Sequence, residues 1–575
     1  MVINVKNSLF RIIALCLVCC ISVGVFASCG ILGNQITPDD NSGSSDNQNN
    51  DNKPSTPPTG EDGGEKEEVY SDKGIFFSSN ASDDGDGTIE KPYNSLETIS
   101  ELTLEAGSYI YIEKGSVFYG SLAISNAHGT DSAPIVVTSY GKGAAPIING
   151  NGLEGSGVIH IANCSNIVVE NLEITDSQTS EGDRRGVLVS CDNNKGTNEI
   201  ITYKNITLKN LYIHDINGFR DAENSGMAMS SKITGGIHLW SNDGLGRVDG
   251  FVVTGCTITE VSNVGIATWH KVENKGNSTS AKMISPYTAE FENYAHKNVH
   301  IDDNEISHIG KNAIFARNLL GGLIEHNVVH DTAKYCVSGN SIVTRSVDGT
   351  VIQYNEGYRN LARVRESDGK LQDGCMLDAD LDSKFTIWQY NYSHDNSFGL
   401  FLNCTNSDDV AIVRYNLSVN DKGNKGVIYI NYVSAGIYVY NNTIVTAYDT
   451  EYIIQSNSNR TSFFYNNIIY NRSATAKFVV DSKCGVIASN NLIYNEYGSS
   501  ITGVEYFKSI NSDGVYDDPM FVGYLQEDSI LGIGNQGTYM LDSNSPALGV
   551  GKKIEEVADF FGNDYKKSLG FYCGK

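Results

Sequence analysis

Charge, proline and helix-type periodicity are all scarce in this sequence. Only 19% of its residues are charged and only 10 of 575 are proline, which is unlike a disordered chain. No long segment repeats its apolar residues at the three-to-four-residue spacing of a helix, so a helical bundle is not indicated. Glycine (58) and tyrosine (32) are plentiful instead, and the short apolar runs are rich in β-branched residues. An all-β chain is therefore the class to consider.

Paired cysteine motifs are missing from the body of the chain. Of the twelve cysteines, eight lie between Cys164 and Cys573, and none of these eight forms a C-x-x-C pair. A zinc or redox site is therefore not indicated. We expect these cysteines to be small buried apolar residues rather than disulfides.

The longest apolar run is at the N-terminus, and it is short. Lys6 and Arg11 precede a run over residues 12–27, which falls below the ~20 residues needed to span a bilayer. A basic start, a short apolar core and small residues describe a secretory signal. Ser28-Cys29-Gly30 resembles the end of a bacterial lipoprotein signal, in which Cys29 becomes acylated. We expect residues 1–29 to be this signal, and the protein to be exported and lipid-anchored at the bacterial cell surface, touching the membrane only through its lipid.

Residues 30–73 have almost nothing to bury. They are mostly Asn, Asp, Ser, Gly, Pro and Glu, which predicts a flexible acidic linker. The linker contributes −7 and the signal +2, so residues 74–575 carry −21 of the total charge of −26. Nucleic acid and anionic polymers are poor partners for such a surface.

An asparagine-punctuated repeat runs through most of the body. Runs such as VVENLEI (Asn171), TLKNLYI (Asn210) and HIDDNEI (Asn304) share one pattern, and LIEHNVV through IASNNLI continue it. From Asn304 to Asn491 the steps are 23, 28, 36, 25, 26, 25 and 24 residues. A period in the mid-twenties with β-type runs predicts stacked coils, because one coil cannot bury its own apolar face.

The ends of the body predict caps. Ser95 and Glu97 predict the start of one short capping helix. The stretch from IFFSSNASDDGDG to PIING resembles the N-terminal cap of the pectate-lyase-like superfamily, and DDPMF with DSNSPALGVG resembles its closing segment. The resemblance implies an all-β fold, a single-stranded right-handed parallel β-helix. We assign residues 74–150 to the cap and first coils, 151–500 to the β-helix, and 501–575 to the closing segment.

Several coils contain a second strand-like run after a small residue, and these runs predict an outer face. When they are aligned on that residue, the first and third positions are mostly apolar and should face inward, so the second and fourth should face outward. The predicted outward residues are His238, Trp240, Trp269, Met376, Asp378, Phe401 and Asn403, with Asp380 two residues further on. Exposed tryptophans beside carboxylates suit a sugar cleft. The alternative is that loops 192–203 and 272–296 cover both tryptophans.

The sharpest cluster is the run DGCMLDAD. Asp378 and Asp380 lie two residues apart, near the carboxyl separations used by glycosidases, and two close carboxylates push their pKa values apart. Asp373 and Asp380 lie seven residues apart, which resembles the catalytic pair of β-helix lacto-N-biosidases. A straight strand would separate them by ~23 Å, so this pairing requires a bend near Gly374.

Three functions remain open. The first is a glycoside hydrolase with Asp373, Asp378 and Asp380 as catalytic candidates, and with a sugar-binding set of His238, Trp240, Trp269, His270, Arg317, His394 and Asn403. The second is a polysaccharide lyase using Arg317, Arg363 or Arg365 with a cation. The third is a non-catalytic glycan-binding adhesin. We expect a monomer that needs no cofactor; a structural calcium ion on Asp378, Asp380 and Asp382 is the alternative.

Overall fold

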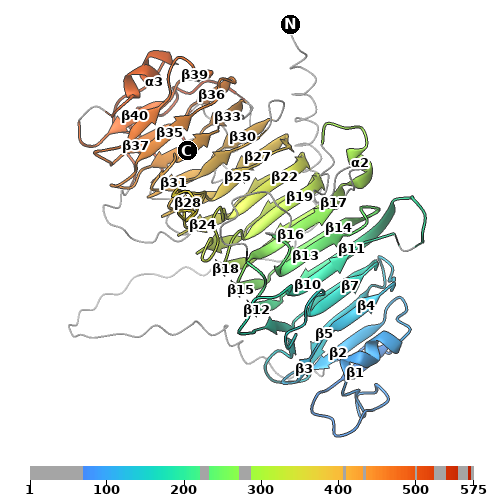
Figure 1. The fold of residues 1–575 in the computed structure, drawn as a ribbon. Helices are drawn as coiled ribbons and strands as arrows, with labels where there is room; N and C mark the ends of the chain where they lie inside the picture. Colours follow the sequence, from blue (N-terminus) through green and yellow to red (C-terminus); the bar gives the residue numbers. More distant parts are fainter. Residues whose placement is uncertain are drawn as a thin grey trace, which may run out of the picture. The chain divides into compact units, whose positions relative to one another are not determined.

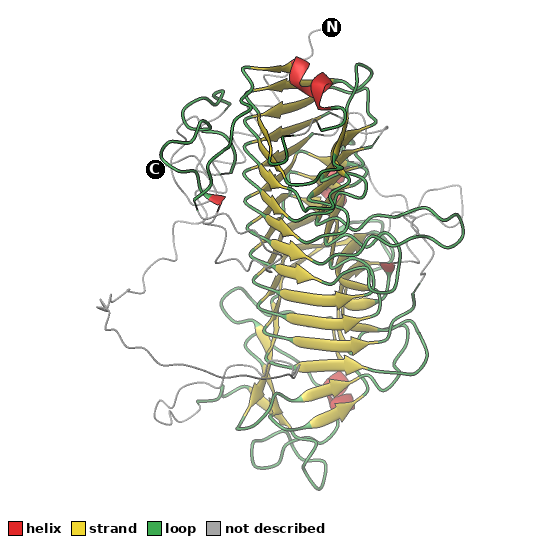
Figure 2. Cartoon of the chain, turned by 90° about the vertical axis from the view of Figure 1, so that its left-hand side faces the viewer, coloured by secondary structure: helices red, strands yellow, loops and turns green. Residues whose placement is uncertain are grey.

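The structure is a computed structural model, and within residues 71–575 it is a stack of coils made of parallel strands (Figures 1 and 2). It describes residues 69–193, 195–220, 232–270, 286–405, 410–431, 436–498, 501–522, 539–554 and 568–571. Each full coil contributes three strands to three rows. The first and second rows merge into one 28-stranded sheet and the third row forms a separate 13-stranded sheet. The predicted parallel β-helix is therefore confirmed.

The first row holds the strand that opens each coil. Its members are β4 (Leu122–Ser125), β7 (Ile159–Ala162), β10 (Arg185–Ser190), β13 (Gly235–Ser241), β16 (Val264–His270), β19 (Ile314–Leu320), β22 (Ile342–Asp348), β25 (Leu377–Ala379), β29 (Phe401–Asn403), β32 (Ile428–Ile430), β35 (Tyr452–Ser456) and β38 (Lys477–Val479), with β26 (Ser383–Lys384) joined to β22.

The second row follows at the next corner of each coil. Its members are β1 (Gly74–Phe77), β2 (Tyr109–Glu113), β5 (Ile135–Tyr140), β8 (Ile167–Glu170), β11 (Ile201–Lys209), β14 (Gly246–Thr254), β17 (His296–Asp302), β20 (Leu323–Glu325), β23 (Val351–Gln353), β27 (Thr386–Gln389), β30 (Ala411–Arg414), β33 (Ile437–Tyr440), β36 (Ser462–Tyr465), β39 (Val486–Ser489) and β41 (Asn511–Ser512).

The third row completes each coil. Its members are β3 (Val117–Tyr119), β6 (Ile147–Asn149), β9 (Glu173–Asp176), β12 (Tyr212–Ile216), β15 (Thr257–Val261), β18 (Glu305–Ile309), β21 (Val328–His330), β24 (Glu356–Tyr358), β28 (Tyr392–His394), β31 (Leu417–Val419), β34 (Thr443–Val445), β37 (Ile468–Asn471) and β40 (Leu492–Asn495). A short helix, α2 (Phe291–Tyr294), lies outside the rows.

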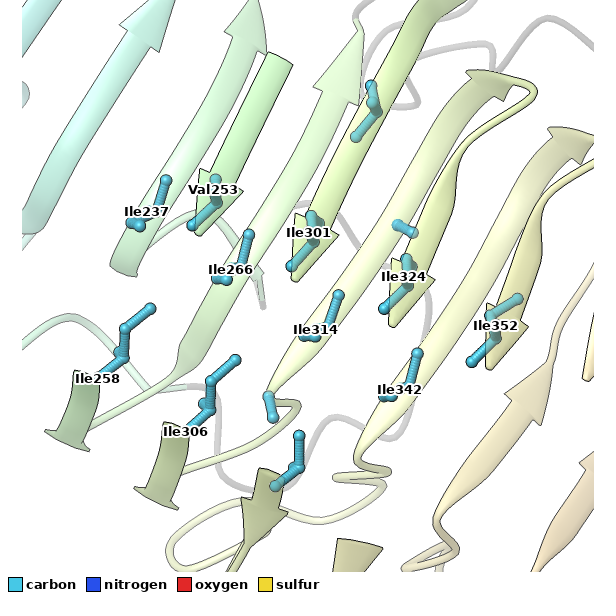
Figure 3. Packing of buried hydrophobic residues seen from close by; sticks show 14 of the residues in the cluster. Ile237, Val253, Ile258, Ile266, Ile301, Ile306, Ile314, Ile324, Ile342 and Ile352 are labelled. Carbon is cyan, nitrogen blue, oxygen red and sulfur yellow. The ribbon is translucent and has the colours of Figure 1, made fainter. Parts of the chain in front are cut away.

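Columns of identical or similar side chains fill the interior. Ile237, Ile266, Ile314 and Ile342 occupy the same position of successive first-row strands, and all four are fully buried (Figure 3). Burying one such side chain contributes roughly 1.5–3 kcal/mol. The core therefore grows by one layer with each coil, as expected of a solenoid.

The asparagine repeat forms a buried amide row at the corner between the second and third rows. The side-chain Nδ2 of each asparagine donates to Oδ1 of the asparagine one coil on, at 2.9–3.0 Å, along Asn304, Asn327, Asn355, Asn391, Asn416, Asn442, Asn467, Asn491 and Asn511. Asn171 and Asn210 do not belong to this row. Both have positive φ and sit one residue earlier, and Leu172 and Leu211 occupy the buried corner position instead.

Short helices cover the two ends of the core. The helix η1 (Leu96–Glu101) is a 3₁₀ helix, and the Ser95 hydroxyl accepts a hydrogen bond from Glu97 N at 3.2 Å. Its Leu96 and Ile99 join the core. At the other end, α3 (Val504–Ile510) buries Val504 and Phe507 against the same core.

The closing segment does more than cover an end, because part of it lies along the third row. Tyr539, Leu541, Ala547, Leu569 and Phe571 pack on an apolar outer surface that includes Leu417, Val445, Ile468 and Leu492. Asn441 Nδ2 donates to the carbonyl oxygens of Ser568 (3.0 Å) and Gly570 (3.2 Å). The last coils therefore have a second, smaller apolar core outside the coil.

Residues 1–29, including Cys29, and most of the linker lie outside the described residues. Among the residues described, no helix is long and apolar enough to cross a membrane. Cys164, Cys191, Cys256, Cys336 and Cys375 are buried, as expected for these five.

Candidate active site

Asp378 and Asp380 lie on the outer face of the first row. In the paired strands, Leu377 aligns with the buried Ile342, Asp378 with Val343, and Ala379 with Thr344. Since side chains alternate along a strand, Asp378 and Asp380 point away from the core, as predicted. Asp378 shares its column with His238, Ala267, Phe315 and Val343, whereas Asp380 continues the column of Trp240, Trp269, Arg317 and Arg345.

The predicted alignment of several coils is wrong by one or two residues. Phe401, predicted outward, pairs with Leu377 and makes an edge-to-face contact with Trp388 inside the core. Asn403 follows in the inward column and is fully buried, so the geometric basis for its sugar-binding role is lost. Phe315 is the third residue after Asn312, a position expected to face inward, but it faces outward instead.

The physical reason is that the small residue before each strand does not have the same structural role in every coil. A Cβ on Gly374 would lie 2.3 Å from Leu361 O, so this glycine permits a close chain crossing before the strand rather than marking where the strand begins. Met376, also predicted outward, therefore sits before β25 and is buried in the core.

Asp378 is enclosed and incompletely paired. It is 6% exposed, its Oδ2 accepts a hydrogen bond from Asn340 Nδ2 at 2.6 Å, and its Oδ1 has no protein partner. Burial raises its pKa well above the ordinary aspartate value, and the nearby carboxylates of Asp380 and Asp373 raise it further. Asp378 therefore favours the protonated form.

Asp380 has a cationic partner. Arg345 Nη1 lies 3.5 Å from Asp380 Oδ2, and Leu381 N donates to Asp380 Oδ1 at 2.8 Å. Both side chains of the ion pair are nearly buried, at 12% exposure for Asp380 and 10% for Arg345. Asp380 therefore has a cation and a backbone N–H as partners, whereas Asp378 has one neutral amide.

Asp373 belongs to the same group. It precedes β25 in a segment without strand structure, so the ~23 Å separation of a straight strand does not apply to Asp373 and Asp380. Its side chain is 27% exposed, and Lys425 Nζ lies 3.5 Å from Asp373 Oδ1. Its charge also raises the pKa of Asp378. Asp373 and Asp380 are therefore both close enough to Asp378 to interact with it electrostatically.

Buried cations lie near the aspartates; Arg317 was among the predicted sugar-binding residues, whereas Lys232 and Arg345 were not predicted from the sequence. Lys232 Nζ lies 4.1 Å from the centre of the Phe315 ring and Arg317 Cζ lies 5.1 Å from it. Burial lowers the pKa of Lys232 to about 7, and burial together with Arg345 lowers the pKa of Arg317 to about 9. Aligning SIVTRSVD on Ile342 would have found Arg345, because it places Val343 and Arg345 on the outer face.

The two tryptophans form a cluster with each other. Their ring centres are 4.0 Å apart at an interplanar angle of 51°, and Arg185 Cζ lies 5.5 Å from the Trp240 ring. Trp269 is only 5% exposed, whereas Trp240 is partly exposed and donates to Asn242 Oδ1 at 2.6 Å. Of the two rings, only Trp240 has surface to offer a sugar.

His238 is buried beside this cluster, and burial lowers its pKa to about 3. It is therefore a neutral imidazole at physiological pH. The His270 side chain lies outside the described part of the chain.

His394, which belongs to the predicted sugar-binding set and was therefore expected near the aspartates, lies elsewhere. It belongs to β28 in the third row, where its ring nitrogens contact Asp395 Oδ2 (2.7 Å) and Glu356 Oε1 (3.1 Å). The chain turns through the corners of its coil between Asp380 and His394, which places them on different sheets.

Two of the three arginines named for a lyase, Arg363 and Arg365, have surroundings of their own. Arg363 is exposed, and Arg365 forms an ion pair with Asp368. Among the described residues, no three His, Cys, Asp or Glu side chains form a metal-holding group.

Comparison with known proteins gives one consistent result. No family model matches the chain. A lacto-N-biosidase of Bifidobacterium longum subsp. longum is 29% identical over 483 residues, covering 70% of this chain and 29% of the relative. The chain is similar to lacto-N-biosidases. It spans under a third of that relative's length.

A solved lacto-N-biosidase structure shares the fold. The GH136 lacto-N-biosidase from Eubacterium ramulus superposes with a TM-score of 0.51 at 23% identity, covering 77% of this chain and 66% of that one. Its selenomethionine derivative gives 0.50. The predicted resemblance to β-helix lacto-N-biosidases is confirmed, and at this identity the structural match supports the fold.

Proposed function

We propose that this protein is a glycoside hydrolase acting on a neutral or weakly charged glycan at the outer face of the first row. The observation that carries the proposal is the arrangement of Asp373, Asp378 and Asp380, which differ in exposure and in hydrogen-bond and ion-pair partners. Environments that separate two carboxyl groups in this way supply the acid and the carboxylate that glycoside hydrolysis needs. Similarity to lacto-N-biosidases supports the same class of reaction.

Asp380 is the reacting carboxylate in this proposal. It belongs to both the Asp373/Asp380 and the Asp378/Asp380 pairs, and its carboxylate form pairs with the Arg345 guanidinium. In that form it can act as a nucleophile or as a base toward water.

Asp373 is the proton donor. A donor must reach the glycosidic oxygen, and Asp373 is more exposed than Asp378, at 27% side-chain exposure. Its seven-residue spacing to Asp380 matches the lacto-N-biosidase pair. Lys425, 3.5 Å from Asp373 Oδ1, balances the charge that Asp373 gains when it gives up its proton. Asp378 is enclosed and bonded to Asn340. Its protonated Oδ1 can donate a hydrogen bond within the site, which makes it a positioning residue.

Three isosteric variants test these roles. Asp380→Asn should abolish turnover of every substrate. Asp373→Asn should lose more activity on a natural glycan than on an aryl glycoside with an acidic leaving group, because the latter needs less proton donation. Asp378→Asn should lower the turnover of both substrates by the same factor.

Glycosides of lacto-N-biose are the first substrates to test, because the similar proteins are lacto-N-biosidases. Products that absorb ultraviolet light would indicate a lyase, and unchanged glycan binding with no turnover in the wild type would indicate an adhesin. Activity should survive chelation by EDTA, because Arg345, Asn340 and Lys425 accompany the carboxylates.

We further propose export and lipid attachment at Cys29. The support is the order of basic, apolar and small residues before this cysteine. Cys29→Ser should abolish incorporation of labelled fatty acid in a bacterial host and release the protein from the membrane fraction. Retention of the label would overturn the assignment.

A further inference from the structure

The outer face of the first row continues beyond the aspartates into a hollow. The hollow has a volume of about 660 Å³ and lies against β35 and β38, with Asn457, Asn459, Phe478, Val479, Asp481 and Lys483 among its lining residues. Asn457, Asn459, Asp481 and Lys483 are exposed, so the hollow is open to solvent.

A row of side chains links the aspartates to this hollow. The column of Asp378 continues through Leu402, Tyr429, Gln455 and Val479 in the paired strands. In the parallel column, Cys404 N, Asn431 N and Asn457 N bond to Ala379, Asn403 and Ile430 carbonyl oxygens in turn, so this column continues from Asp380 through Cys404 and Asn431 to Asn457. Asn457 Nδ2 also donates to the Tyr429 hydroxyl at 3.2 Å.

The chemistry of the hollow suits an uncharged sugar. The amides of Asn457 and Asn459 can both donate to and accept from hydroxyl groups. Asp481 and Lys483 supply one charge of each sign, so the lining has no net charge to attract an anion. Val479, which is 37% exposed, offers an apolar surface for a sugar ring.

The spacing matches a chain of sugars. Three coil rises separate β25 from β35, and at ~4.8 Å per rise this is about 14 Å. One rise is close to the length of one monosaccharide, so a glycan bound at Asp380 reaches the hollow after a few units.

We propose that this hollow is a distal subsite that binds a neutral sugar unit of the glycan cleaved at Asp380. The proposal rests on the proposed hydrolase function. It implies that the substrate is an oligosaccharide or polymer extending along the coil axis on one side of the cut, and that Tyr429, Asn431 and Gln455 contact the intervening units.

The test compares a short aryl glycoside with a longer oligosaccharide that carries the same terminal sugars. In the wild type, kcat/KM should be higher for the longer substrate. The double variant Asn457→Ala/Asn459→Ala should lower kcat/KM about tenfold on the longer substrate, as expected for lost hydrogen bonds, and leave the aryl glycoside unaffected. Val479→Arg, which fills the hollow, should do the same. Asn544→Ala, an exposed amide of the closing segment, is the matched control and should change neither.

Equal effects on both substrates, or no effect on either, would overturn the subsite and leave the hydrolase standing. If the wild type cleaves no glycan, calorimetry with the longer oligosaccharide decides the matter. Binding that the double variant abolishes would support the hollow while the hydrolase proposal fails. Absence of binding would overturn both.

Discussion

Two lines of buried polar residues run along the coils, and they differ in how completely their atoms are paired. In the asparagine row, Asn391 Nδ2 donates to Ile352 O and to Asn416 Oδ1, and its own Oδ1 accepts from both nitrogens of Asn355. On the outer face of the first row, Asp378 Oδ1 and Trp269 Nε1 are buried without a protein partner.

The difference separates a structural role from a binding role. A buried polar atom without a partner costs free energy, so the paired row stabilises the coil whereas the outer face bears a cost. Such a cost is expected where a ligand supplies the missing partner. Substitutions in the asparagine row should therefore mainly lower the free energy of unfolding, whereas substitutions on the outer face should mainly lower activity.

The largest effect is expected for Asp380. Asp380→Asn should lower kcat/KM on the order of 10⁴-fold, because the reacting carboxylate is lost. The thermal midpoint should fall moderately, because the nearly buried Arg345 loses its counter-charge. Steady-state kinetics and calorimetry measure the two quantities. Asp83→Asn, at an exposed acid, is the control; a lower midpoint with kcat/KM unchanged would instead assign Asp380 a structural role.

The asparagine row should respond in the opposite way. Asn391→Leu leaves Asn355 N and one Asn355 amide hydrogen without their acceptor, so it should lower the free energy of unfolding by about 3 kcal/mol. Asn304→Leu deprives only Cys256 N of an acceptor and should cost about 1–2 kcal/mol less. Urea denaturation measures both. Equal losses would show that the amides contribute through size rather than through hydrogen bonds.

Asp378 should make stability depend on pH. Its pKa is raised by burial and by Asp380, so the folded protein retains a proton that the unfolded chain releases. The free energy of unfolding should therefore fall as pH rises from the ordinary aspartate pKa near 4 through the raised one, by about 1.4 kcal/mol per pH unit.

Asp378→Asn removes that dependence. The variant should be more stable than the wild type above this window and no more stable below it, in urea denaturation at several pH values. Parallel pH profiles of the two proteins would contradict the protonated state of Asp378.

The smallest effect is expected for Trp240. Trp240→Ala should raise KM about fivefold with kcat nearly unchanged, since a single aromatic contact contributes about 1 kcal/mol of binding. Trp269→Ala should mainly lower stability, because that ring is buried. A tryptophan fluorescence spectrum unchanged by a turned-over glycan would remove both from the sugar site.

The fold was predictable because its periodicity comes from residues with one strict role. From Asn304 onward, each asparagine occupies one corner and bonds to its neighbours, so the spacing could be read directly. Before Asn304 the corner holds Leu172, Leu211 and Cys256, and Asn171 and Asn210 imitate the pattern from a positive-φ position.

The site was predictable only in part. The alternation of Asp378 and Asp380 follows from local strand geometry. The placement of Lys232, Arg317 and Arg345 beside them depends on which coils are neighbours and on how many residues each corner contains. His394 shows the same limit, since its closeness in sequence conceals the corners that carry it to another sheet.

The asparagine row also has a direction. In the bonds between side chains, every amide from Asn304 to Asn491 donates to the asparagine of the following coil, and its Oδ1 accepts from the preceding coil. The linked amides therefore lie head to tail and polarise one another. A coil can join such a series only as a whole turn with its amide oriented the same way. Lengthening or shortening of this protein by duplication or deletion should therefore proceed in units of one complete coil, and a partial coil would break the series at its insertion point.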